Sequence, residues 1–97
     1  MILKLAQITV HASTEAQFER ASPMAIRLLA PSEGYLAHEL HRSIETPNRY
    51  LPTVRWRTLE DHTVGFRGSP AFSEWRAQLA PFLAAVPVVE HFLAPGD

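Results

Sequence analysis

The sequence predicts one α+β domain over residues 1–97, with its strands and helices in the order βαββαβ. Three observations carry this prediction. Segments rich in Ile, Leu and Val are typical of strands, and two other segments repeat apolar residues at helical spacing. The two middle strand segments flank the turn Thr46-Pro47-Asn48, which indicates a hairpin.

Residues 1–10 are apolar and predict the first strand. They carry no basic leader and no small-residue cleavage pattern, so we expect a strand and not a signal peptide. Thr14 and Gln17 match a capping box at the start of the first helix. Pro23, preceded by Ser22, predicts that this helix restarts with Ser22 as its cap, or else kinks.

The other predicted strands are the two arms of the hairpin and a last strand, at residues 35–45, 48–57 and 87–93. Thr58 is the predicted cap of a short helix, which Gly65 and Gly68 are expected to break. Ser69 and Pro70 begin the last helix as a cap followed by a first-turn proline. This order is the ferredoxin-like arrangement, a four-stranded antiparallel sheet with both helices on one face.

Such a sheet leaves one face without helices, yet the strands carry apolar residues at both parities. In the first strand Leu3 and Leu5 point one way, while the other parity holds Ile2, Ala6, Ile8 and Val10. An uncovered apolar face is costly in water. We therefore predict a homodimer that packs sheet to sheet through the open face.

Composition excludes several classes of function. The net charge of −1 provides no field that would draw the chain to nucleic acid or to an anionic membrane. Cysteine is absent, which excludes disulfides, thiolate catalysis and cysteine-ligated metals. No apolar run approaches the ~20 residues of a membrane span. We expect a soluble, cytoplasmic protein without a nucleic-acid or membrane partner.

Histidines are the first candidates for chemistry. His38 and His41 lie three apart on a predicted strand and therefore face opposite sides, so they cannot hold one metal ion together. We predict no metal site. His91 lies near a strand end and is not a candidate.

His62 follows the hairpin on a short helix, from which it could lean over a cavity and act as a general base. The alternative is a solvent-facing histidine that interacts with Glu60 or Asp61. Trp56 ends the hairpin and is expected either to line a pocket or to pack in the core. Trp75 belongs to a helical apolar stripe and is expected in the core.

Four arginines cluster on the hairpin. Arg55 and Arg57 share one face and could bind an acidic ligand group. The alternatives are that they are solvated, or that they pair with Glu39 and Glu45 across the hairpin. The glycines form no loop that could cradle a phosphate, so no nucleotide cofactor is expected.

From Leu3 to about Phe92 the sequence resembles the antibiotic biosynthesis monooxygenase family. The likeness is strongest in the turn over residues 46–50, in the Arg-Trp pair that ends at Trp56, and in the Ser-Pro-x-Phe that ends at Phe72. The resemblance implies a dimeric α+β barrel built from ferredoxin-like subunits.

The family includes monooxygenases that oxidise quinol-like or polyketide phenols without flavin, haem or metal, so the resemblance implies no cofactor. It places Gln7 where relatives carry an amide as hydrogen-bond donor, and it places Trp56, His62, Phe66 and Phe72 around a cavity, with His62 as the catalytic base. The implied substrate is a small aromatic phenol or quinol. The alternative is a non-catalytic dimeric barrel that binds an apolar small molecule or acts in a stress response.

Three positions depart from relatives. Many quinol-oxidising members carry histidines where this chain has Phe66 and Ala71, and haem-degrading members carry an axial histidine where it has Arg76. An arginine cannot ligate iron at neutral pH, so haem degradation is not expected. These departures leave His62 as the base and favour the non-catalytic alternative more than the fold alone does.

Overall fold

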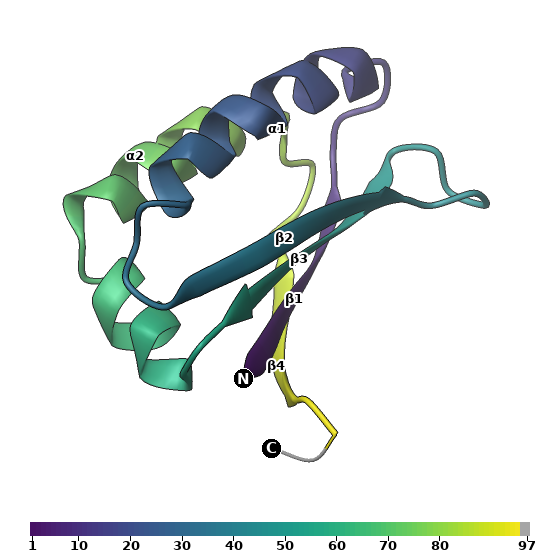
Figure 1. The fold of residues 1–97 in the computed structure, drawn as a ribbon. Coiled ribbons are helices and arrows are strands. Elements are labelled where there is room, and N and C mark those ends of the chain that lie inside the picture. The colour runs from purple at the N-terminus through teal and green to yellow at the C-terminus, as the bar shows by residue number, and fades with distance from the viewer. Residues whose placement is uncertain (96–97) are drawn as a thin grey trace.

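The computed structural model describes residues 1–95 and confirms the predicted α+β fold (Figure 1). In chain order the elements are β1 (Ile2–Thr9), α1 (Glu15–Leu29), β2 (Tyr35–Arg42), β3 (Arg49–Trp56), the π-helical segment η1 (Asp61–Phe66), α2 (Pro70–Leu79), the 3₁₀ segment η2 (Ala80–Phe82) and β4 (Val88–Leu93). The four strands form one antiparallel sheet in the order β2-β3-β1-β4. Both α-helices lie on one face of the sheet, and the other face carries no helix.

The register of the sheet decides which residues share a face. Lys4 lies between Val54 of β3 and His91 of β4, and Ile2 lies beside Trp56. Side chains alternate along each strand, so these residues all face the helices. The odd-numbered positions of β1 face the other way, and with neighbouring strands they expose an apolar set consisting of Leu3, Leu5, Leu51, Val88 and Phe92. The prediction of two apolar parities is confirmed.

Two clusters of buried side chains fill the space between sheet and helices. The first lies under the middle of α1 and comprises Ala6, Ile8, Val10, Phe18, Ala25, Tyr50 and Leu79. The second lies towards η1 and comprises Leu29, Val54, Trp56 and Phe66. Trp75 of α2 is half-buried and packs against both, so it joins the two halves of the core.

Helix α1 differs from its prediction in two ways. Thr14 makes no side-chain cap bond; its hydroxyl donates instead to the carbonyl oxygen of His11 at 2.6 Å, so the capping box is wrong. The helix also runs without a break through Pro23, so the predicted restart at Ser22 is wrong. A proline removes one backbone hydrogen bond. Buried residues on both sides of Pro23, such as Phe18 and Ala25, hold the helix against the sheet.

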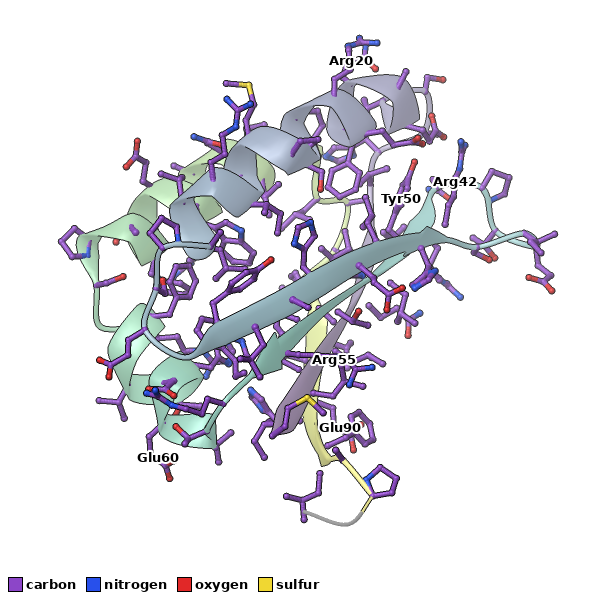
Figure 2. The ribbon with its side chains drawn as sticks, viewed as in Figure 1. Arg20, Arg42, Tyr50, Arg55, Glu60 and Glu90 are labelled. Carbon is purple, nitrogen blue, oxygen red and sulfur yellow. The ribbon has the colours of Figure 1, made fainter. Side chains whose placement is uncertain are left out.

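The far end of α1 is tied to the hairpin. The hydroxyl of Tyr50 donates to Glu19 at 2.5 Å, and Arg42 lies 3.2 Å from the same carboxylate oxygen (Figure 2). Burial and the bond to Glu19 raise the pKa of Tyr50 to about 12, so the phenol remains protonated and remains a donor. Glu19 therefore already serves two partners at this end of the molecule.

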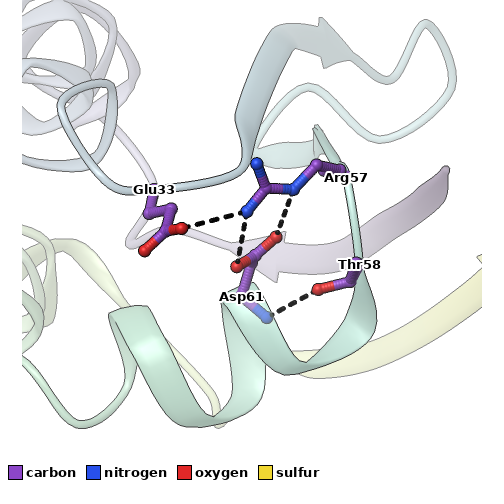
Figure 3. A network of polar contacts seen from close by, with 4 residues as sticks. All are labelled: Glu33, Arg57, Thr58 and Asp61. Carbon is purple, nitrogen blue, oxygen red and sulfur yellow. Dashed lines mark hydrogen bonds and ion pairs between the residues drawn. The ribbon is translucent and has the colours of Figure 1, made fainter.

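At the opposite end, the junction between β3 and η1 confirms one predicted cap. The backbone N–H of Asp61 donates to the Thr58 hydroxyl at 3.1 Å (Figure 3). Arg57 lies between two carboxylates, 3.2 Å from Glu33 and 3.3 Å from Asp61. The predicted pairing of Arg57 with Glu39 or Glu45 is wrong, because Arg57 follows the last residue of β3 and reaches the loop before β2 instead.

Two glycines near this junction, Gly34 and Gly65, differ in their backbone role. Gly34 has a φ of +83°, and its carbonyl accepts a hydrogen bond from the Arg57 N–H at 2.7 Å. The sequence predicts that Gly65 breaks the short helix, but η1 continues through it to Phe66. The π-helical segment has ended by Gly68.

None of the helices within residues 1–95 is long and apolar enough to cross a membrane.

Candidate functional site

His62 is the second residue of η1, and it points into the protein. Only 4% of its surface is exposed, and its ring stacks on the indole of Trp56 with centroids 5.2 Å apart and planes at 25°. Phe66, one turn later, lies 6.4 Å away in a parallel orientation. The solvent-facing alternative, with contacts to Glu60 or Asp61, is therefore wrong.

His62 also contacts a histidine that sequence reasoning did not select. Its Nδ1 lies 2.8 Å from Nε2 of His91, which β4 presents on the same face of the sheet. One of these two nitrogens carries the shared proton when both rings are neutral. A base role for His62 requires that its own Nδ1 donates to His91, because Nε2 of His62 then keeps a free lone pair.

Both imidazoles are neutral at physiological pH. Burial is the main cause that lowers the pKa of His62 to about 3, and the positive charges of Lys4 and Arg67 and the neighbouring His91 act in the same direction. Burial likewise lowers the pKa of His91, with Arg67 and Lys4 as the next causes. The pair is thus placed among cations that oppose its protonation.

Four of the five predicted site residues are brought together. Phe66 lies between Trp56 and Phe72, at centroid distances of 6.0 and 5.5 Å, and His62 stacks beside Trp56. Gln7 is not part of this group. It is exposed at an odd-numbered position of β1, beside Val88, and therefore points from the opposite face of the sheet.

A cavity of about 80 Å³ lies between the sheet and the two helices. Its walls include side chains from β1, β3, α1 and α2, among them Lys4, Ala6, Val54, Ala25, Leu29 and Trp75. The four aromatic and imidazole rings expected around a cavity do not line this one; they meet its lining through Trp75, which contacts Phe66 at 5.8 Å and Phe72 at 6.1 Å. The volume of the cavity is about half that of a cavity of about 150 Å³ known to accept benzene. A one-ring ligand therefore enters only if the lining side chains move apart.

Lys4 is the functional candidate that sequence reasoning missed. It is the one lysine of the chain, it is only 6% exposed, and its ammonium lies 5.5 Å from the ring centre of Trp75. Burial, with the nearby charge of Arg67, lowers its pKa to about 8. A signal was available: Lys4 shares its parity with Ala6 and Ile8, so a lysine stands in a row of buried apolar positions.

The other histidines support no metal site. His38 pairs with Val54 and His41 with Leu51, which places them on opposite faces as predicted. No group of three or more metal-ligating side chains occurs in the part of the chain that is described, residues 1–95. His62 and His91 use one nitrogen each to bind one another.

Comparison with known proteins gives consistent results. The model of the family described as antibiotic biosynthesis monooxygenase matches residues 1–78. The Bacillus subtilis protein YczJ, which is uncharacterized, is 40% identical over 92 residues, which are 95% of this chain and 97% of that protein.

Among solved structures, a Bordetella bronchiseptica protein named for the same family is 39% identical, with a TM-score of 0.92 and coverage of 96% of this chain and 95% of that one. SnoaB of Streptomyces nogalater, a cofactor-independent oxygenase, is 20% identical with a TM-score of 0.83, over 99% of this chain and 94% of SnoaB. At that identity SnoaB demonstrates a shared fold.

Proposed function

The chain belongs to the antibiotic biosynthesis monooxygenase family, and from this premise we propose that it is a cofactor-independent monooxygenase that oxidises a small aromatic phenol or quinol with molecular oxygen. The observation that carries the proposal is the buried, neutral imidazole of His62, which stacks on Trp56. Neither ring lines the cavity, but Phe66 connects Trp56 to Trp75, which does. SnoaB, with the same fold, is an oxygenase that needs no cofactor.

The chemistry asks little of the protein, because a deprotonated phenol is electron-rich enough to pass an electron to molecular oxygen. With a hydroquinone as substrate, one molecule of hydroquinone and one of oxygen give one molecule of hydroxyquinone and one of water. One oxygen atom forms the new carbon–oxygen bond, and the other leaves as water with two hydrogens from the substrate. The substrate itself supplies all four electrons that the oxygen molecule accepts.

The protein therefore has three tasks: to supply a base, an environment for the substrate anion, and exclusion of water. His62 is the proposed base, and Trp56, Phe66 and Phe72 are the proposed apolar walls. No external reductant is required, which agrees with a reaction that uses no cofactor.

The low pKa of His62 has a consequence for this role. A free imidazole with a pKa of about 3 is a weak base, since catalysis is most effective when the pKa lies near the working pH. A phenolate beside the ring favours the imidazolium, because an opposite charge raises the pKa of a base. Proton transfer to His62 is therefore coupled to retention of the substrate anion in the site.

The alternative is a non-catalytic barrel that binds an apolar small molecule or acts in a stress response. The small volume of the cavity, about 80 Å³, and the weak basicity of His62 favour it. Turnover separates the two functions, because a binding protein consumes no oxygen with any ligand.

We expect oxygen uptake by the wild type with at least one member of a panel of hydroquinones and anthrones. Replacement of His62 by glutamine should lower kcat at least about 100-fold, the lower range of general-base contributions. Substitution of the exposed His11 by glutamine is the matched control and should change nothing. Absence of uptake throughout the panel would overturn the enzymatic assignment, and equal rates for H62Q and wild type would exclude His62 as the base.

We also propose that the open face of the sheet, which carries Leu51 and Phe92, packs against a second copy of the chain. Light scattering at micromolar concentration should report a dimer. Leu51→Glu places a charge on that face and should yield a monomer. Met24→Glu, on the exposed side of α1, is the control and should remain dimeric. A monomeric wild type would contradict the proposal.

A further inference from the structure

Lys4 carries a buried positive charge to which the proposed function assigns no role. Its side chain is almost fully buried between β1 and α2, and it lines the cavity. Within residues 1–95 its ammonium has no hydrogen bond or ion pair, and its one recorded contact is the indole face of Trp75 at 5.5 Å. A cation–π contact compensates only part of the cost of burying a charge.

No carboxylate side chain faces Lys4 from the described strands. Glu39 belongs to the residues that line the cavity, but it pairs with Thr53 and its side chain lies on the opposite face of the sheet, 3.8 Å from His41. In the described strands, no helix-facing position holds an aspartate or glutamate, and the charged or titratable residues there are Lys4, His38, Arg42 and His91, with the phenols Tyr35 and Tyr50. Arg42 is neutralised by Glu19, which is bound at the other end of α1. Lys4 instead acts electrostatically on His62 and His91 and is itself opposed by Arg67.

These four residues, Lys4, His62, Arg67 and His91, are called the basic cluster below. The basic cluster adjoins a further donor without an acceptor: the indole N–H of Trp56, whose ring stacks on His62, is buried and has no hydrogen-bond partner among the residues described. An ammonium without a counter-ion is what an anionic ligand in the cavity would satisfy, because Lys4 lines it. The indole N–H of Trp56 lies beside His62 and outside the lining of the cavity.

We propose that the cavity is an anion site, in which Lys4 binds the ionised oxygen of a small aromatic acid and Trp75 covers its ring. The chemistry shared by the candidate ligands is an oxyanion on an aromatic ring, either a phenolate or a carboxylate. The phenolate form rests on the proposed function, because it is the reactive species of the oxygenation. Lys4 is thereby a specificity residue that selects the ionised ligand, while the base remains His62.

The site imposes a pH dependence of known sign. Lys4 has a lowered pKa of about 8, so it is mostly protonated at pH 7 and mostly neutral at pH 10. A bound anion favours the charged form and raises this pKa, and by linkage the affinity for the anion falls as the pH rises through it. The groups that face Lys4 are Trp75 from α2, His91 from β4, His62 from η1 and Arg67 just after it.

The single lysine makes the test direct. Protein whose lysine carries ¹³C at Cε gives one lysine side-chain NMR signal, so the titration of Lys4 is read without any variant. Benzoate and 4-nitrophenolate are the two anionic probes, and benzyl alcohol is the uncharged analogue of benzoate. We expect each anion to raise the pKa of Lys4 by about one unit and the alcohol to leave it unchanged. Benzoate affinity should fall about tenfold between pH 7 and pH 10.

A variant pair checks the same point by affinity. Benzoate is ionised at pH 7 and should bind the wild type at least about tenfold more tightly than benzyl alcohol. At pH 8, 4-nitrophenolate should also bind at least about tenfold more tightly than benzyl alcohol. Lys4→Met, which keeps the length of the side chain and removes the charge, should lose this preference. Arg20→Met removes a cation from the outer side of α1 and should keep it (Figure 2).

The outcomes separate this inference from the proposed function. Failure of both anions to bind more tightly than the alcohol, or a preference that persists in K4M, overturns the anion site whatever the oxygen uptake. A pKa that rises with 4-nitrophenolate alone assigns a phenolate site, and a rise with benzoate alone assigns a carboxylate site. Anion binding without oxygen uptake supports the anion site and overturns the monooxygenase assignment, because binding requires no turnover.

Discussion

Trp56→Ala is expected to lower the free energy of unfolding by about 4 kcal/mol, the range measured for removal of a large aromatic side chain from a core. Trp56 is completely buried, and its ring contacts His62, Phe66 and Tyr35. A domain of this size has a total stability of about 5–15 kcal/mol, so the loss is severe. Urea denaturation followed by far-UV circular dichroism measures it without relying on tryptophan fluorescence.

Trp56→Phe is the matched control. It keeps an aromatic ring against His62 and removes the indole N–H, which has no partner within residues 1–95. We therefore expect a cost of about 1 kcal/mol, mainly from the lost volume. If the phenylalanine variant were as unstable as the alanine variant, the expectation that the N–H contributes little to the stability of the free protein would be wrong.

Gly34→Ala is expected to destabilise the protein by about 3 kcal/mol. The φ of +83° is unfavourable for a residue with a Cβ atom, by roughly 1–2 kcal/mol. The added Cβ would also lie 2.1 Å from the Asp61 carboxylate oxygen, which is far inside contact distance. Asp61 would have to move and lose its ion pair with Arg57. Thermal unfolding compared with the wild type measures the effect.

Two further variants identify the cause. Gly65→Ala has its nearest neighbour at 3.8 Å, an ordinary contact, and should be neutral or slightly stabilising because alanine favours a helical backbone. The double variant Gly34→Ala with Asp61→Gly removes every clashing atom, including the Asp61 Cβ that would lie 2.6 Å from the new Cβ, so its loss should be smaller than the sum of the two single losses. Additive losses would show that the backbone conformation of Gly34 alone accounts for its effect.

The sequence predicted the arrangement of elements because alternation and turn chemistry are local. The hairpin around residues 46–48, the cap at Thr58 and the proline start of α2 all depend on residues a few positions apart. The same local reasoning failed at Thr14 and Pro23. At Pro23, burial of residues on both sides of the proline holds the helix together against its local preference, and at Thr14 the hydroxyl bonds to the carbonyl of His11 instead of capping the helix.

The candidate site was predicted in part for a related reason. Trp56, His62, Phe66 and Phe72 lie close in sequence, and the structure brings their rings together. His91 reaches His62 from the last strand, 29 residues away, and no local pattern indicates that contact. To select Lys4 from the sequence, one must know that the even-numbered positions of β1 are the buried ones. Gln7 was expected in the site because of the family resemblance, but as an odd-numbered residue of β1 it lies on the helix-free face of the sheet.

The alternation of β1 has a consequence for how this chain can change during evolution. Lys4 and Ala6 face the cavity, whereas Leu5 and Gln7 face outward on the helix-free side. A substitution therefore alters one face at a time, and the cavity and the outer surface can diverge separately. Deletion of a single residue between Lys4 and Gln7 would exchange the two faces over the rest of the strand. Related chains should therefore tolerate many replacements in β1 and almost no change in its length.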